Sequence, residues 1–171
     1  MKKILIYGLL LSVTLLFSAC NDKKNTNTMS EAKFSDIKVG NKLVDFTLDD
    51  QFDKKHSLTD ETKKVIFVCS KPAGHIVREY LKAQSVDYLP SRHIIFIADV
   101  SGMPSLIYKM FALPDFKDSP YSILLILKKE NASKFRNEKR KDDIMVLSLD
   151  HKTITKIEYF NNEKDFVKAI D

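Results

Sequence analysis

Paired cysteines, clustered histidines and a strong net charge are all missing from this sequence. Its 171 residues contain two cysteines, Cys20 and Cys69, and four widely separated histidines. Metal sites use close Cys and His spacings such as i, i+4, so we expect no metal and no cofactor. The formal charge of +5 is too mild to argue for nucleic acid as a partner. Because no repeat or internal linker is evident, the sequence predicts one folded domain.

The first nineteen residues have the order of a secretion signal. Residues 1–3 carry two lysines, residues 4–17 are almost wholly apolar, and Ser18 and Ala19 are small. This order predicts a signal peptide over residues 1–19 that is removed on export. A transmembrane anchor is the alternative, but a helical span needs about 20 apolar residues, and this run stops in a polar stretch.

The end of the signal, Leu16-Phe17-Ser18-Ala19-Cys20, resembles a bacterial lipobox. The resemblance implies that Cys20 becomes the N-terminus and carries acyl chains such as palmitate. Two or three acyl chains hold a protein firmly in a bilayer, so the lipid bilayer is a predicted partner through Cys20. Asn21, which replaces the Asp that retains enteric lipoproteins in the inner membrane, favours the outer membrane, facing the periplasm. Ordinary cleavage near Ala19, giving a free periplasmic protein, is the alternative.

The acylated Cys20 would be followed by a polar segment. Residues 20–33 have nothing to bury, so we expect a flexible tether that could reach about 40 Å when extended. Residues 34–171 have the size of one ordinary domain with a real core.

The first half of this domain alternates between strand and helix patterns. The predicted elements are a hairpin of strands 45–50 and 56–58, strand 65–69, helix 74–84 and strand 93–100. The continuous apolar runs of the last two strands are typical of strands buried on both faces. A strand, a helix and a strand in succession predict a right-handed parallel crossover.

The second half begins with a helix opened by Pro104, because proline is tolerated in a first helical turn. Leu106, Ile107, Met110 and Phe111 are its predicted inward face, so we interpret Met103 and Met110 as core residues rather than copper ligands. The later predicted elements are strand 121–127 after Ser119-Pro120, turn 128–131, strand 133–136, hairpin strands 144–149 and 153–160, and a final helix capped by Asn162 with Phe166, Val167 and Ile170 inward.

Residues 39–50 (VGNKLVDFTLDD), residues 55–60 (KHSLTD) and the strand ending at Cys69 resemble the peroxiredoxin and TlpA-like branch of the thioredoxin superfamily. The hairpin between Ser133 and Phe160 is similar to that of YtfJ-type periplasmic proteins. The resemblance implies an α/β, thioredoxin-like three-layer fold with a central mixed β-sheet and an extra C-terminal β-hairpin.

The family's Cys-x-x-Cys pair is absent. Its positions fall on Pro72-Ala73-Gly74-His75, and Ser119-Pro120-Tyr121 resembles the cis-proline turn that faces the active site. A trans proline entering an edge strand is the alternative. The family's peroxidatic pattern, Pro-x-x-x-Thr-x-x-Cys, is also absent.

Two side chains are catalytic candidates. Cys69 could be a nucleophile if a helix dipole and Lys71 stabilise its thiolate, but a cysteine that closes an apolar strand usually packs as a small hydrophobe. His75 could act as an acid or base at the start of the helix, or it could simply be solvated.

A binding groove is the other candidate site. Its predicted residues are Ser70, Lys71, Pro72, His75, Ser119 and Pro120, with residues 102–104 beside them. Ser70, Lys71 and the amides of residues 73–75 could hold an anion at the helix start, and a capped helix with a solvated lysine is the alternative. Residues 134–141 are basic but are offset by nearby acids, so a solvated loop is the simplest interpretation, with anionic lipid contact as the alternative.

These observations lead to two functional hypotheses. The first is a membrane-tethered periplasmic protein of the cell envelope that lacks dithiol chemistry and binds an envelope protein or a small anionic ligand. The second is an enzyme, a thiol-dependent oxidoreductase or peroxidase that uses Cys69 with an external thiol.

Overall fold

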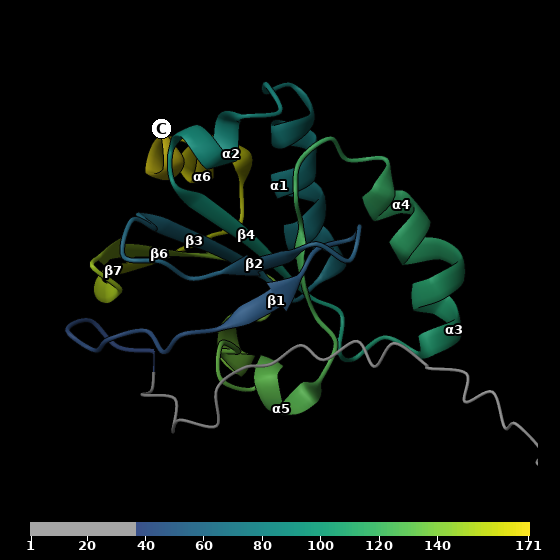
Figure 1. Cartoon of the computed structure of the whole chain (residues 1–171), viewed down its shortest axis with the longest axis horizontal. Coiled ribbons are helices and arrows are strands. Elements are labelled where there is room, and N and C mark those ends of the chain that lie inside the picture. Colours follow the sequence, from purple (N-terminus) through teal and green to yellow (C-terminus); the bar gives the residue numbers. More distant parts are fainter. Residues whose placement is uncertain (1–36) are drawn as a thin grey trace, which may run out of the picture.

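The computed structural model describes residues 37–171, and its centre is a five-stranded mixed sheet covered by helices (Figure 1). The strand order is β5-β4-β3-β6-β7. Strands β3 (Lys64–Val68), β4 (Ile94–Asp99) and β5 (Leu124–Ile126) are parallel, whereas β6 (Ile144–Asp150) and β7 (Thr153–Phe160) are antiparallel to their neighbours. The predicted signal peptide, Cys20, the predicted tether and the first residues of the predicted domain lie outside the described residues.

The predicted central strand is confirmed. Strand β3 pairs in parallel with β4 and antiparallel with β6, so Ile66 lies between Phe96 and Val146. Residues 65–68 are all buried, as expected for a strand whose two faces are both covered. The parallel crossover through α1 (Lys71–Lys82) and α2 (Tyr88–Ser91) to β4 follows the prediction, except that α2 was not foreseen.

Two apolar clusters, one on each face of the sheet, make the fold three-layered. Helices α1 and α6 (Glu163–Ile170) cover one face through Val77, Leu81 and Phe166. The other face carries the hairpin of β1 (Thr47–Asp49) and β2 (Lys55–Ser57) together with α5 (Lys129–Ala132), whose side chains pack on Phe67 and Met145. None of the helices in the described range 37–171 is long and apolar enough to cross a membrane.

The segment after Pro104 is helical as predicted, but its inward face is not the predicted one. It consists of α3 (Ser105–Ile107), the π-helical turn η1 (Tyr108–Ala112) and α4 (Leu113–Lys117). Tyr108, Leu113 and Phe116 pack against the core. The predicted core residues are exposed instead: Leu106 by 66%, Ile107 by 43%, Met110 by 59% and Phe111 by 62%.

A physical reason for this error is that the segment is apolar on two sides. Residues 108, 113 and 116 are apolar or aromatic and recur at roughly one-turn intervals, just as residues 106, 107, 110 and 111 form a helical stripe, so periodicity alone does not choose between the faces. Pro114 adds a local irregularity because it has no N–H to donate. The helix accommodates it with a wide turn, in which the Leu113 N–H bonds the Tyr108 carbonyl five residues earlier.

The last third contains one wrong strand and one confirmed hairpin. The predicted turn 128–131 is largely the helix α5, and the predicted strand 133–136 does not form. The reason is packing: Ala132 and Phe135 are buried beneath the sheet, where Phe135 stacks on Phe67 at 5.3 Å between ring centroids. The β6–β7 hairpin forms as predicted and extends the central sheet. Asn162 caps helix α6 as predicted, since its side chain accepts from the Asp165 N–H at 3.0 Å.

Candidate functional site

The predicted helix-start residues directly follow β3. Ser70 is the N-cap of α1, and its hydroxyl accepts from the Ala73 N–H at 3.4 Å while its carbonyl accepts from the Gly74 N–H at 3.0 Å. Lys71, Pro72 and His75 are exposed, and the imidazole Nδ1 of His75 lies 3.8 Å from the Glu79 carboxylate. This end of α1 is therefore a capped helix start with a basic, solvent-facing rim.

The predicted cis-proline turn is wrong, because the Ser119–Pro120 bond is trans. Trans is the preferred form of an X–Pro bond, and here the proline precedes β5, an edge strand of the sheet, which is the alternative that the sequence left open. Ser119 is buried and Pro120 is exposed. The strongest link between Pro120 and a thioredoxin active site is thereby lost, and ligand binding by the groove residues stays a prediction.

A buried glutamine, which sequence reasoning missed, holds this proline segment. The Gln51 side-chain amide donates to the Tyr121 carbonyl at 2.7 Å, and its oxygen accepts from the Ile123 N–H at 2.8 Å. Gln51 is 1% exposed, so both bonds lie in the interior. Gln51, which follows β1 at the tip of the β1–β2 hairpin, thus provides hydrogen-bond partners for the backbone that leads from Pro120 into β5.

Asp50, next to this glutamine, gathers a second polar cluster. Its Oδ2 lies 2.8 Å from His56 Nε2 and accepts from the Ser122 hydroxyl at 2.8 Å, while Oδ1 accepts from the N–H groups of Phe52 and Lys54. Burial raises the pKa of Asp50, but these hydrogen bonds outweigh burial and leave the pKa below its usual value. A hydrolytic triad needs the histidine between the serine and the carboxylate. Here the carboxylate is in the middle, so the cluster ties the hairpin to the β5 segment.

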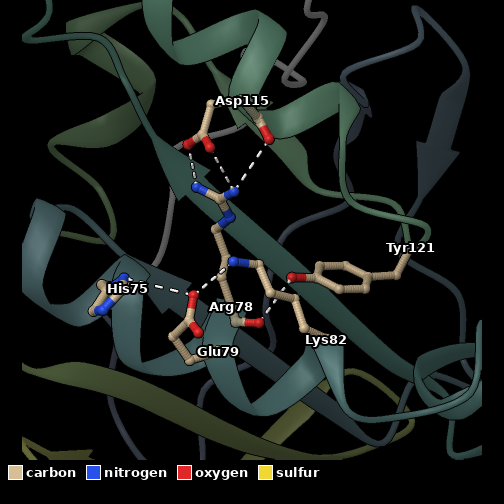
Figure 2. A network of polar contacts seen from close by, with 6 residues as sticks. All are labelled: His75, Arg78, Glu79, Lys82, Asp115 and Tyr121. Atoms are coloured by element: carbon tan, nitrogen blue, oxygen red, sulfur yellow. Dashed lines mark hydrogen bonds and ion pairs between the residues drawn. The ribbon is translucent and has the colours of Figure 1, made fainter.

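A third network fastens the helical segment 105–117 to α1 (Figure 2). The Arg78 guanidinium makes a two-pronged ion pair with Asp115 and also donates to the Asp115 carbonyl oxygen at 3.1 Å. It lies over the Phe116 ring at 5.4 Å from the centroid. The hydrogen bond from Arg78 lowers the pKa of Asp115, and the Tyr121 hydroxyl donates to the Arg78 carbonyl oxygen at 3.4 Å. Sequence reasoning missed this pair because its members are 37 positions apart.

Cys69, the catalytic candidate, follows the last residue of β3. Its thiol donates to the Lys141 carbonyl oxygen at 3.2 Å. Burial, and then the negative charge of Asp99, raise the pKa of the thiol to about 11, although Arg136 opposes them. The Asp99 carboxylate is itself paired with Arg136, whose guanidinium donates to Asp99 Oδ2 at 2.6 Å. A nucleophilic cysteine needs a lowered pKa, so the surroundings of Cys69 do not supply the thiolate stabilisation that a catalytic role would require, and they agree better with the alternative of a packed cysteine.

Within residues 37–171, no three His, Cys, Asp or Glu side chains gather so as to hold a metal ion. The two methionines considered as copper ligands differ in environment, since Met103 is partly buried and Met110 is exposed.

Comparison with known proteins identifies the fold alone. No family model matches the sequence, and no curated protein matches it. The structure is similar to the peroxidoxin BcpB from Mycobacterium tuberculosis, with a TM-score of 0.52 and 13% identity over 78% of this chain and 94% of that chain. It is also similar to a proposed thioredoxin from Neisseria meningitidis, with a TM-score of 0.53 and 14% identity over 74% of this chain and 85% of that chain. A third similar structure is a peroxiredoxin-like protein from Aquifex aeolicus, with a TM-score of 0.50 and 4% identity over 80% of this chain and 87% of that chain. The domain therefore has the predicted thioredoxin-like fold.

Proposed function

We propose that this chain is a lipoprotein of the bacterial cell envelope, anchored through Cys20 to the outer membrane, whose thioredoxin-like domain works by binding rather than by dithiol chemistry. The order of charge, apolar run, small residues and Cys20 in the sequence supports the anchor. The environment of Cys69 carries the second part of the proposal.

A dithiol cycle needs one thiolate to attack and a second to resolve the mixed disulfide. If Cys20 is acylated, Cys69 is the only thiol left in the chain. With a pKa of about 11, roughly one Cys69 in ten thousand would be a thiolate at pH 7. With Cys20 acylated, the chain would thus lack both the reactive thiolate and the resolving thiol, which supports a role in binding.

The binding surface proposed for this domain is the exposed start of α1. Lys71, Pro72 and His75 face solvent there, and a cationic side chain at a helix N-terminus suits a small anionic ligand or an acidic segment of an envelope protein.

Activity assays test the absence of redox chemistry. The protein should not catalyse insulin disulfide reduction or peroxide turnover under conditions in which an active thioredoxin or peroxiredoxin does. Cys69→Ala should keep the cellular role and lower the free energy of unfolding by on the order of 1 kcal/mol, through lost sulfur packing. If Cys69→Ser abolishes function without unfolding the domain, the one-cysteine oxidoreductase replaces this proposal.

Metabolic labelling with a fatty-acid analogue tests the anchor. The wild-type protein should incorporate the label and fractionate with membranes in a diderm host, whereas Cys20→Ser should do neither, since the acyl chains attach to that sulfur. Cys69→Ser is the matched control, because it also removes one thiol but should leave labelling unchanged. Unlabelled wild-type protein would contradict the lipoprotein assignment.

A further inference from the structure

We infer that the exposed apolar face of the helical segment 105–117 lies in the headgroup region of the bilayer to which the domain is tethered. This face, called the apolar stripe below, consists of Leu106, Ile107, Met110 and Phe111. The inference rests on the proposed membrane anchor and adds to it the surface that contacts the lipid.

The apolar stripe is an unusual feature of the described surface. Four of its seven exposed large hydrophobic side chains lie within six consecutive positions. Scattered apolar side chains are normal on a protein surface, but a contiguous group marks a contact with another apolar phase. The stripe is therefore the part of the described surface best suited to an apolar contact.

The segment is held rigidly in this orientation. Tyr108, Leu113 and Phe116 pack on the core from the opposite side, and the Arg78–Asp115 pair fixes α4 to α1 (Figure 2). The helix cannot rotate to bury the stripe without breaking this ion pair and uncovering that inner face. The stripe is thus displayed by the fold itself.

The charges around the stripe suit an anionic lipid surface. Lys109 and Lys117 are exposed on the same segment, and Lys71 and Lys82 lie close enough to Asp115 to lower its pKa. The Asp115 carboxylate is already matched by Arg78. Apolar residues flanked by lysines are the pattern of helices that lie in a membrane interface, where the lysines contact anionic headgroups.

The length of chain before the domain allows this contact. The described chain begins at Ile37, and Gly40 and Leu43 are hydrogen-bonded near the β6–β7 hairpin, away from α3 and α4 (Figure 1). The residues between Cys20 and Ile37 could span up to about 55 Å, whereas a domain of this size is about 35 to 40 Å across. A Cys20 anchor would therefore leave every face able to reach the bilayer, and the most apolar face would be favoured at the high local concentration that tethering creates.

The absence of tryptophan from the chain provides a direct test. Phe111→Trp places a single fluorophore in the stripe, and Val86→Trp is a matched control, because Phe111 and Val86 are 62% and 60% exposed. Protein is extracted with detergent from whole expressing cells, so that acylated and non-acylated forms are both recovered, and is mixed with vesicles of phosphatidylethanolamine and phosphatidylglycerol (3:1) that contain brominated acyl chains. Acylation of the same samples is measured by fatty-acid labelling.

We expect the indole fluorescence of the Phe111→Trp protein to shift to the blue and to be quenched, and that of the Val86→Trp protein to stay unchanged. Adding Leu106→Ser and Ile107→Ser to Phe111→Trp should abolish the quenching, while the Arg78–Asp115 pair remains intact. Labelled protein with unquenched fluorescence would overturn the stripe contact and leave the anchor standing. Quenched fluorescence from unlabelled protein would overturn the anchor and leave the stripe contact standing. A blue shift that appears without lipid and depends on protein concentration would assign the stripe to a second copy of the chain and overturn the inference.

Discussion

Cys69 should react with a maleimide at pH 7 roughly 100-fold more slowly than an unperturbed cysteine. The maleimide reacts with the thiolate, and a pKa of about 11 in place of 9.0 lowers the thiolate fraction about 100-fold. Burial is the larger cause and the neighbouring Asp99 charge the second. The hydrogen bond from the thiol to the Lys141 carbonyl acts in the same direction, because it is made by the protonated form.

The pH profile separates this explanation from simple blockage of access. A raised thiol pKa means that the protonated form persists until pH approaches 11, so the labelling rate should rise about tenfold for each pH unit and should not level off below pH 10. Asp99→Asn should increase the rate, because it removes the negative charge that opposes the thiolate. Cys69→Ala gives the background, and Lys82→Ala, a charge change on the exposed end of α1, is the control. A rate that levels off near pH 7 would contradict the high pKa and favour the one-cysteine enzyme.

The fold could be predicted where a local pattern has a single meaning. Strands β3 and β4 follow from uninterrupted apolar runs, because a segment without polar side chains can lie only between two covered faces. The β6–β7 hairpin follows from two strand patterns separated by a short polar connection, and α6 follows from the capping chemistry of Asn162. Each of these signals is contained in one continuous short stretch of the sequence.

The errors occur where the local pattern fits two structures. Residues 106–116 have helical periodicity on both sides, and only the packing of Tyr108 and Phe116 against the core decides which side is buried. Residues 133–136 are predicted to be a short strand, but Phe135 packs beneath the sheet and stacks on Phe67. A choice that depends on a distant partner is not contained in the segment itself.

The polar clusters could not be predicted for the same reason. Arg78 and Asp115 stand on different helices, and Gln51 stands 70 positions before the backbone that it satisfies. Nothing in the residue types distinguishes these side chains from solvated ones, since a glutamine in a turn is usually exposed. The structure therefore adds information that changes the candidate site, because these contacts hold the Pro120 segment and the apolar stripe in place.

Gln51→Ala should lower the free energy of unfolding by about 3 kcal/mol, or more than 100-fold in the unfolding equilibrium. The substitution leaves the Tyr121 carbonyl and the Ile123 N–H in the interior without their partners, and each buried group left unpaired costs about 1 to 3 kcal/mol. Urea unfolding measures the change as a lower midpoint with an unchanged slope.

Two further variants show whether hydrogen bonding or side-chain volume causes the loss. Gln51→Glu keeps the side-chain volume and the oxygen that accepts from the Ile123 N–H, but it replaces the amide that donates to the Tyr121 carbonyl. If hydrogen bonding matters, this variant should still be less stable than the wild type. Gln84→Ala is the control, because Gln84 is the other glutamine of the chain and is partly exposed after α1; it should change stability by less than about 0.5 kcal/mol. If Gln51→Ala were as mild as this control, the Pro120 segment would be held by its apolar neighbours Tyr121 and Ile123, and Gln51 would have no part in positioning it.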